Sequence, residues 1–197
     1  VLPTAGAASQ PAQPHVARPA LARRRRMETL AAARQHGLDA AHEHFLDAPD
    51  GRLDRLAAAE RLALRAALAR IVATVRAREI FVPLLGDGST EHDAAHWHAQ
   101  AALALAGQSP QIWEYPVWAW WNPLRLSGRL IHLADNYRLE LGPARAAKLR
   151  ALACHATQLM PLPPWREAVL PAPLAEFGTA AVEFHFLRST SPTPCPH

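Results

Sequence analysis

The stretch IFVPLLGDGSTEHDAAHWH, residues 80–98, joins an apolar run to a polar turn that contains two glycines. Its continuous apolar part is typical of a strand covered on both faces, as in a parallel sheet flanked by helices. Gly86 and Gly88 allow the backbone to turn sharply without a Cβ penalty. Thr90 followed three residues later by Asp93 resembles a capping box. The stretch therefore predicts a strand, a turn and a helix in succession.

His92 falls in the first turn of this expected helix, where the helix dipole disfavours an imidazolium ring. A neutral imidazole is the form that binds metal ions, and the carboxyl end of a strand is where α/β sheets carry their sites. His92 and His96 are four residues apart and could share a metal, although no His-Glu-x-x-His motif is present. The spacing alone leaves open a capped helix that merely carries a surface histidine.

Strand and helix patterns alternate outward from this stretch. Helices are expected at residues 20–37, 53–78, 93–105 and 142–158, and strands at residues 42–47, 80–85, 111–118, 127–135 and 181–187. This alternation predicts an α/β protein, a three-layer α/β/α Rossmann-like domain with a mostly parallel sheet. Residues 1–188 are expected to form a single domain, followed by a disordered tail at 189–197.

Composition narrows the functional classes. No apolar run in the 197 residues approaches the roughly 20 needed to cross a bilayer, so no transmembrane segment is expected. Cys154 and Cys195 lie far apart, which argues against a disulfide framework or a cysteine zinc ribbon and favours a cytoplasmic location. The net charge of +4 includes the arginine run at 23–26, but Ala and Leu interrupt the basic residues at helical spacing. A solvated helix face is therefore favoured over a nucleic-acid partner.

Several motifs occur in the order and spacing of one enzyme family. They are GDGSTEHD, IWEYPVWAWW, KLRALACHATQL and LPAPLAEFGTAAVEFHF. With them the chain resembles the LmbE-like (PIG-L) family of zinc-dependent N-deacetylases, which hydrolyse the N-acetyl group of GlcNAc-containing glycolipids, glycosides and related small amides. VLPTAGAAS resembles the family's second strand and the turn after it, and ARRRRMETLAAARQHG resembles its Arg-x-x-Glu helix. The resemblance covers nearly the whole chain.

The resemblance assigns roles to the turn after the apolar run. In the family, zinc is held by a His-Pro-Asp-Asp motif and by the last histidine of a His-Pro-Asp-His motif, which STEH at residues 89–92 matches. His92 is thereby implied as a zinc ligand, and Glu91 as a carboxylate behind it. Ser89 stands where the family has a histidine that assists the tetrahedral intermediate and the leaving amine, a role that a serine cannot fill as an imidazolium. Asp87 is expected to line the same pocket.

Three further positions carry over from the resemblance. Arg25, with Glu28 three residues on, resembles an arginine that reaches toward substrate, and Asp50 resembles a sugar-binding aspartate. His155, before Thr-Gln, resembles a histidine that contacts substrate or intermediate, so it joins Ser89 and Asp87 as a candidate catalytic residue. A surface arginine, a turn-forming aspartate and a core histidine remain the structural alternatives. Packing is favoured over sugar stacking for a nearby aromatic group, Trp113, Tyr115, Trp118, Trp120 and Trp121.

No His-Pro-Asp-Asp motif occurs in the sequence, so two implied metal ligands and the general base are missing from it. Because the resemblance places Val1 in the second strand, the first strand and its motif are expected upstream, and zinc is not expected to be held tightly by this chain. The exposed sheet edges would then favour association, such as a homo-oligomer.

The implied function is removal of an N-acetyl group from a GlcNAc-containing or related small acetylated amine, by the complete protein as a metal-dependent hydrolase. Its expected partner is thus an acetylated sugar or glycoconjugate. The alternative, prompted by Ser89, is a catalytically inactive relative that serves as a sugar-binding or regulatory module.

Overall fold

The computed structural model describes residues 1–6, 18–120, 136–161, 168–170 and 172–188. The chain separates into two compact units, each described here by itself. Unit 1 comprises residues 1–51 and 140–182, and unit 2 comprises residues 52–139 and 183–197. The expected strand at 127–135, the expected tail and Trp121 lie outside the described residues.

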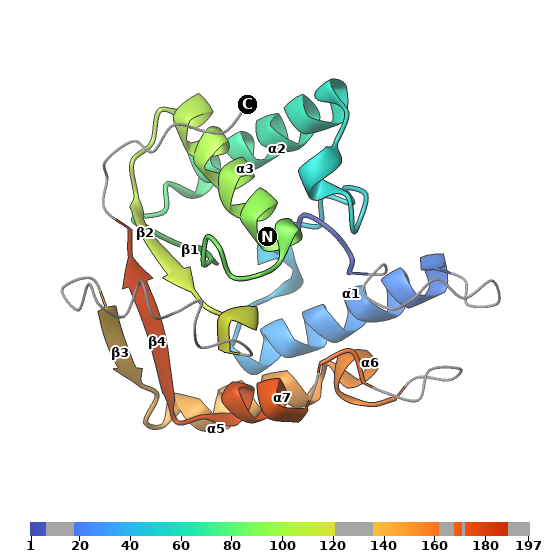
Figure 1. The fold of residues 1–197 in the computed structure, drawn as a ribbon, viewed down its shortest axis with the longest axis vertical. Coiled ribbons are helices and arrows are strands. Elements are labelled where there is room, and N and C mark those ends of the chain that lie inside the picture. Colours follow the sequence, from blue (N-terminus) through green and yellow to red (C-terminus); the bar gives the residue numbers. More distant parts are fainter. Residues whose placement is uncertain (7–17, 121–135, 162–167, 171, 189–197) are drawn as a thin grey trace. The chain divides into compact units, whose positions relative to one another are not determined.

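A four-stranded sheet belongs mainly to unit 2 (Figure 1). Only the terminal residues Glu140 and Val182 of two of its strands fall within the residue ranges of unit 1. The strands are β1 Glu79–Pro83, β2 Gln111–Tyr115, β3 Asn136–Glu140 and β4 Val182–Leu187, in the spatial order β1-β2-β4-β3. β1 pairs with β2 in parallel, whereas β2 pairs with β4 antiparallel. The predicted α/β class is confirmed, and the β4 pairing makes the sheet mixed. A strand's residues do not encode its direction, so this reversal has no local signal.

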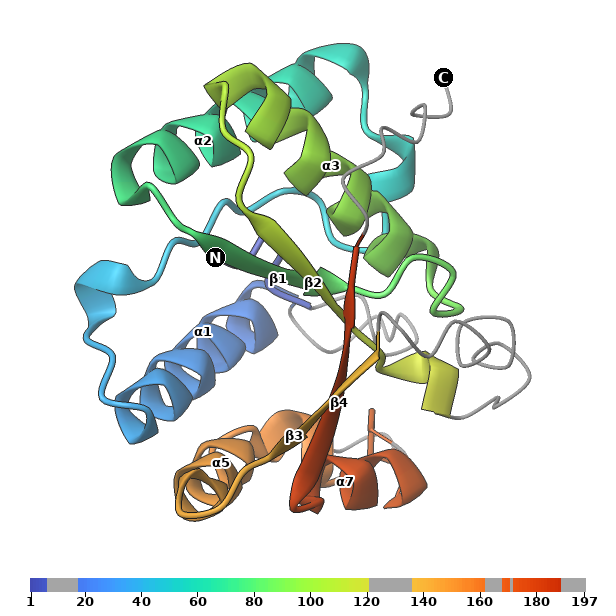
Figure 2. The ribbon, with the colours of Figure 1, turned by 90° about the vertical axis from the view of Figure 1, so that its left-hand side faces the viewer.

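Two helices of unit 2 pack against one another over the β1–β2 pair (Figure 2). These are α2, Ala58–Val75, and α3, Thr90–Ala106, which connects β1 to β2. The α3 face includes buried Ala94, Ala102 and Leu103, and its two alanines allow a close approach of neighbouring elements. A core cluster of unit 2 forms from Leu84, Ala119 and Phe186, with Trp120 packed against it.

Several helices and strands of unit 2 end at other residues than the sequence predicts. The helix expected at 53–78 is two elements, the short 3-10 helix η2 at Leu53–Arg55 and α2, which ends before a left-handed Arg76 with φ 51°. α3 ends before Gly107, whose φ of 61° favours glycine. The strand expected at 111–118 stops at Tyr115, and η3, Trp118–Trp120, follows it.

Unit 1 is mainly helical. Its helices are η1 Ala40–His42, α1 Arg18–Gln35, α5 Ala144–Ala153, α6 Ala156–Leu159 and α7 Ala172–Thr179. α1 contacts α5 and α6, and α5 contacts α7. The helix expected at 142–158 is broken at His155, whose ψ of 49° leaves the helical region. The strand expected at 42–47 is reduced to one bridge between Phe45 and Leu2.

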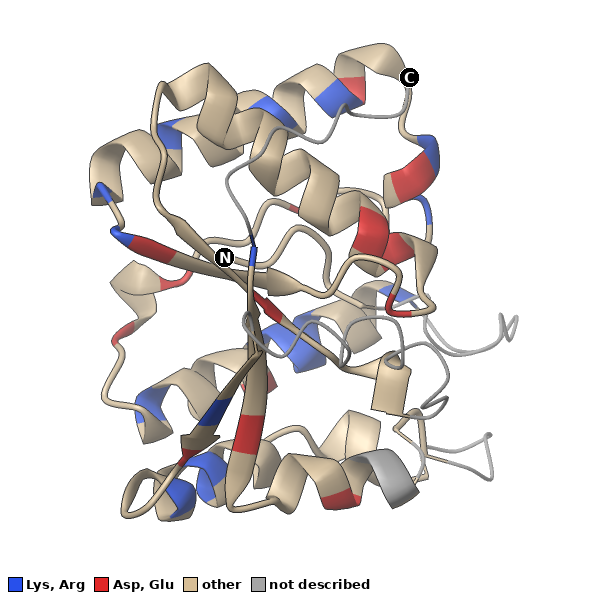
Figure 3. Cartoon of the chain, turned by 60° about the vertical axis from the view of Figure 1, so that its left-hand side comes forward, with Lys and Arg blue, Asp and Glu red and all other residues tan. Residues whose placement is uncertain are grey.

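The arginine run of α1 does not form a uniformly solvated face, which corrects the expectation for it. Arg25 is buried with 5% of its surface exposed. Arg26 forms an ion pair with Asp47 at 2.6 Å and lies over the ring of Phe45, 4.4 Å from its centre. Lys and Arg are carried by α1, α2 and α5, whereas the only Asp and Glu residues of α3 lie in its first turn (Figure 3). Among the described helices, none is long and apolar enough to cross a membrane.

We expect the two units to unfold together, as one domain, because the chain passes between them three times, at 51/52, 139/140 and 182/183. Far-UV circular dichroism follows the helices of both units. Tryptophan fluorescence follows mainly unit 2, whose residue ranges contain five of the six tryptophans, all except Trp165. Coincident thermal midpoints for the two signals are the expected result, and two separated midpoints would contradict a single cooperative domain.

Candidate functional site

The turn between β1 and α3 depends on glycine and on an aspartate that closes it. Gly86 and Gly88 have φ values of 79° and 101°, which side chains rarely tolerate. α3 begins at Thr90, three residues before the expected start at 93, and its N-cap is Ser89, where Thr90 was expected as the cap. The expected capping box is wrong at Asp93, because its Oδ1 instead accepts a hydrogen bond from the Gly86 N–H at 2.7 Å. The turn is thus tied to the first helical turn.

Asp87 is the centre of this region and is fully buried. Its Oδ1 accepts hydrogen bonds from the backbone N–H groups of Val117 at 2.9 Å and Ala119 at 2.8 Å. Its Oδ2 accepts from the Trp118 N–H at 3.0 Å and lies 2.6 Å from Nδ1 of His92. One carboxylate therefore joins the turn after β1, the segment after β2 and the start of α3.

These contacts determine the charge on Asp87 and the tautomer of His92. Burial by itself raises the pKa of Asp87, but the hydrogen bonds from His92 and three backbone N–H groups outweigh it, and the pKa lies below its usual value. Because an ionised carboxylate only accepts hydrogen bonds, Nδ1 of His92 carries a proton, and Nε2 is the ring nitrogen that does not contact Asp87. The His92 side chain is 25% exposed. A carboxylate that orients an imidazole in this way is typical of metal-binding histidines.

His96 does not share a ligand with His92. Its side chain is fully buried, and Nδ1 lies 3.1 Å from the Pro83 carbonyl oxygen and 3.4 Å from Oε1 of Glu114. Glu114 is also buried and accepts a hydrogen bond from Nη1 of Arg188 at 3.2 Å. His96 is therefore part of a buried polar cluster, and the chelating pair that its spacing allowed is not formed.

The described residues fit a zinc site only in part. His92 has the orientation of a ligand, yet no group of three or more His, Cys, Asp or Glu side chains in this part of the chain could hold a metal ion. A catalytic zinc normally needs three protein ligands, so no reaction step through zinc follows from these residues. Ser89 Oγ accepts from the His92 N–H at 3.4 Å, and Glu91 Oε1 accepts from the Leu53 N–H at 2.9 Å.

A second polar cluster lies in unit 1 around Thr157. The Thr157 N–H and hydroxyl donate to the two oxygens of Glu28, at 3.0 Å and 2.6 Å. Its Oγ1 also accepts from Nε of Arg25 at 3.4 Å, and Nη1 of Arg25 donates to the Gly6 carbonyl. Arg25, Glu28 and Thr157 are all buried. The Arg-x-x-Glu spacing on α1 thus presents two charged side chains to one threonine.

His155 and Asp50 belong electrostatically to the same cluster. Burial lowers the pKa of His155; Glu28 raises it by less, and Arg25 lowers it further. Nδ1 of His155 accepts a hydrogen bond from the Gln158 amide at 3.3 Å, which leaves the proton on Nε2. Burial also lowers the pKa of Arg25, against the smaller opposing effects of Asp50 and Glu28.

Thr157 is the residue that the sequence did not single out. Only the Thr-Gln step after His155 hinted at it, and nothing local connects it to Glu28, which is 129 positions away in the chain. The predicted packing role of the aromatic group holds for Trp113, which stacks on Phe81 with ring centres 6.4 Å apart. Trp120 likewise packs on Phe184 at 5.7 Å.

We expect Asp87→Asn to lower the free energy of unfolding by about 2–3 kcal/mol, because an amide nitrogen would face backbone donors that now bind a carboxylate. The matched control is Asp47→Asn, at an aspartate whose side chain is 66% exposed. That change should cost less than about 0.5 kcal/mol. Urea titration measures both, and equal effects would contradict the central place of Asp87.

The same pair of proteins tests the sign of the pKa shift. A carboxylate whose pKa is lowered in the folded state stabilises the fold above its unfolded pKa, which is about 4, and loses that contribution as pH falls through the folded value. The difference between the unaltered protein and Asp87→Asn should therefore be constant near neutral pH and shrink below about pH 4.

We expect Thr157→Val to lower the free energy of unfolding by about 2–3 kcal/mol, since Glu28 loses a buried hydroxyl donor while the side-chain shape is kept. Thr74→Val is the matched control, because the exposed Thr74 hydroxyl bonds only within α2, to the Arg70 carbonyl. It should change stability by less than about 0.5 kcal/mol. Denaturant titration measures the free energy of unfolding of both variants. Equal values for the two would show that the cluster around Thr157 contributes little to stability.

Comparison with known proteins agrees with the resemblance. The solved structure of GalB, the 4-carboxy-2-hydroxymuconate hydratase from Pseudomonas putida KT2440, matches with a TM-score of 0.62 at 16% identity, over 94% of this chain and 78% of that one. This likeness shows a shared fold. No curated protein matches the sequence. The family model described as PIG-L: GlcNAc-PI de-N-acetylase matches residues 1–103 of 197. The chain therefore belongs to the PIG-L (GlcNAc-PI de-N-acetylase) family.

Proposed function

We propose that the protein is a zinc-dependent hydrolase that removes the N-acetyl group from a GlcNAc-containing or related small acetylated amine. The overall reaction consumes one water, breaks the amide C–N bond and releases acetate and a free amine. Membership of the family supports the reaction class. The observation that carries the proposal is the 2.6 Å contact between Asp87 and Nδ1 of His92, which directs the Nε2 lone pair away from the carboxylate.

In this proposal His92 is a metal ligand and Asp87 is a positioning residue. The negative charge of Asp87 holds the ring in one tautomer and makes Nε2 a better donor to a cation. When bound, zinc supplies Lewis-acid activation of water and of an amide carbonyl. Glu91 is proposed as a further carboxylate near the ligand, and the contact of its Oε1 with the Leu53 N–H holds it in place.

Ser89 is proposed to donate a hydrogen bond from its hydroxyl to the acetyl group that reacts. Its oxygen accepts a hydrogen bond from the His92 backbone N–H, which leaves the hydroxyl proton available for this contact. A hydroxyl donates a hydrogen bond but does not serve as a strong acid near neutral pH. We therefore expect Ser89 to stabilise charge modestly, with the leaving amine protonated through water.

The substrate contacts are proposed in unit 1. Arg25 and Asp50 are assigned to the sugar, and His155 to the substrate or intermediate. The hydrogen bonds of Arg25 to Gly6 and Thr157 support this, because a guanidinium held in one orientation loses little entropy on binding. The lowered pKa of His155 keeps it neutral at pH 7, so it would act as a hydrogen-bond donor through Nε2.

One alternative is a catalytically inactive family member that binds a sugar. The observation in its favour is the lack of a three-ligand group among the described side chains, together with serine at position 89. Sugar binding needs only the polar contacts of unit 1, whereas hydrolysis needs an activated water as well.

The purified protein, supplied with zinc, should release acetate from an N-acetylglucosamine derivative. His92→Ala should lower kcat/KM by at least about 100-fold, and Asp87→Asn should weaken zinc affinity by about 10- to 100-fold. His42→Ala, at an exposed histidine of η1, is the matched control and should leave both quantities unchanged.

Acetate release and bound zinc are measured in parallel on each variant. Full activity in His92→Ala would overturn the ligand assignment. Sugar binding without acetate release, in zinc-loaded protein, would reject the hydrolase and support the binding module.

A further inference from the structure

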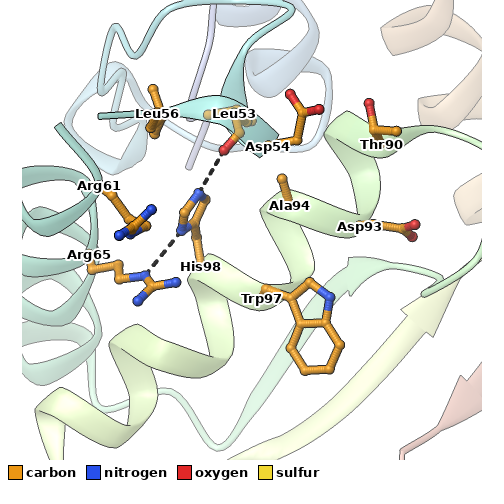
Figure 4. Close-up of a pocket in the computed structure, with 10 residues that line it drawn as sticks. All are labelled: Leu53, Asp54, Leu56, Arg61, Arg65, Thr90, Asp93, Ala94, Trp97 and His98. Carbon is orange, nitrogen blue, oxygen red and sulfur yellow. Dashed lines mark hydrogen bonds between the residues drawn. The ribbon is translucent and has the colours of Figure 1, made fainter. Parts of the chain in front are cut away.

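Unit 2 contains a pocket that the proposed reaction does not use (Figure 4). Its volume is about 730 Å³, within the usual range of about 300–1,000 Å³ for small-molecule sites. η2, α2 and the first turns of α3 surround it, and neither Asp87 nor His92 is among its lining residues. The pocket is therefore separate from the cluster around Asp87.

Two arginines of α2 line one end of this pocket. Arg61 and Arg65 are one helical turn apart, a spacing at which like charges repel. Neither forms an ion pair with any carboxylate in the part of the chain that the structure describes. Figure 4 shows both side chains beside His98, on the same side of the pocket. Two adjacent guanidinium groups in this arrangement are suited to an anion.

His98 holds one of these cations in position. It is 4% exposed, its Nε2 lies 3.1 Å from the Leu53 carbonyl oxygen, and its Nδ1 accepts a hydrogen bond from Nε of Arg65 at 3.2 Å. Burial lowers the pKa of His98, an effect that Arg65 and Arg61 reinforce and the Leu53 contact opposes. His98 is thus a neutral ring that orients Arg65 and leaves its terminal nitrogens to a ligand.

The opposite end of the pocket offers hydrogen-bond acceptors. Oδ1 of Asp54 accepts a hydrogen bond from Nε of Arg55 at 3.4 Å, and Oδ1 of Asp93 accepts one from the Gly86 N–H at 2.7 Å. Among the described residues, no hydrogen bond or ion pair involves Oδ2 of either carboxylate, and both residues line the pocket. Figure 4 places the Trp97 ring near Asp93, where it can lie against a flat or apolar ligand surface. A ligand must therefore be anionic at one end and donate hydrogen bonds at the other.

We propose that this pocket binds a small oxyanion, a phosphate monoester or a carboxylate, whose anionic group lies between Arg61 and Arg65 and whose remaining part carries hydroxyl groups toward Asp54 and Asp93. Planar guanidinium groups bind both kinds of oxyanion through paired N–H donors. The inference does not depend on the proposed hydrolase, because it requires no metal and no reaction.

The test is calorimetric titration of the full chain at low ionic strength, first with inorganic phosphate, then with glycerol 3-phosphate and with glycerate. We expect saturable binding at one site, tighter for the two organic anions because they add hydroxyl donors. Tighter binding of glycerol 3-phosphate would identify a phosphate site, and tighter binding of glycerate would identify a carboxylate site. Indole NMR of Trp97, assigned through Trp97→Phe, should shift with the same dissociation constant.

Matched variants separate this pocket from general charge attraction. Arg61→Ala should weaken binding about tenfold, whereas Arg70→Ala, which removes another exposed arginine of α2 outside the pocket, should weaken it less than about twofold. Arg65→Lys keeps the charge but loses the Nε contact to His98, so an intermediate loss is expected.

Three results would overturn the inference: no saturable binding of any of the three anions, equal weakening by Arg61→Ala and Arg70→Ala, or loss of binding in His92→Ala. The last would place the anion at the other cluster. A failed acetate assay leaves this titration unaffected, so the two proposals can fail independently.

Discussion

The hydrogen bonding of the Asp87 carboxylate is the constraint around which unit 2 is organised. A buried negative charge is expensive unless it is fully solvated by protein groups, and Asp87 has three backbone N–H donors and one imidazole N–H. The backbone donors begin at Val117, 30 positions after Asp87 in the chain, and the imidazole donor is His92, five positions after it. One side chain thus fixes the loop after β2, the turn after β1 and the direction of the His92 ring.

The cluster in unit 1 follows the same physical rule with different residues. Glu28 is buried and its two oxygens are used by the backbone and hydroxyl of Thr157, while Arg25 provides the compensating charge. In both clusters a buried carboxylate is held inside the protein by hydrogen bonds from backbone N–H groups and from a neighbouring side chain. Such groups have defined orientations before any ligand arrives, which is the physical requirement for a binding or catalytic site.

The fold alone does not decide between the chemistries of its members. The similar solved structure is that of a hydratase, whereas the family model is named for a de-N-acetylase. Both reactions add water, so the distinction depends on side chains at the site. In this chain the residues proposed for that site follow β1, where Ser89 serves as the cap of α3 and Nδ1 of His92 contacts Asp87.

The sequence by itself determined the strand, turn and helix of residues 80–98, the α/β class and the position of His92 in the first turn of α3. These features follow from apolar runs, glycines and cap residues, whose effects act within a few positions. Only the tertiary structure decided that Ser89 caps the helix while Asp93 closes the turn, that β4 runs antiparallel to β2, and that Thr157 joins Arg25 and Glu28. Each of these depends on which of several capable partners comes within hydrogen-bonding distance, and that distance is set by packing between segments far apart in the chain.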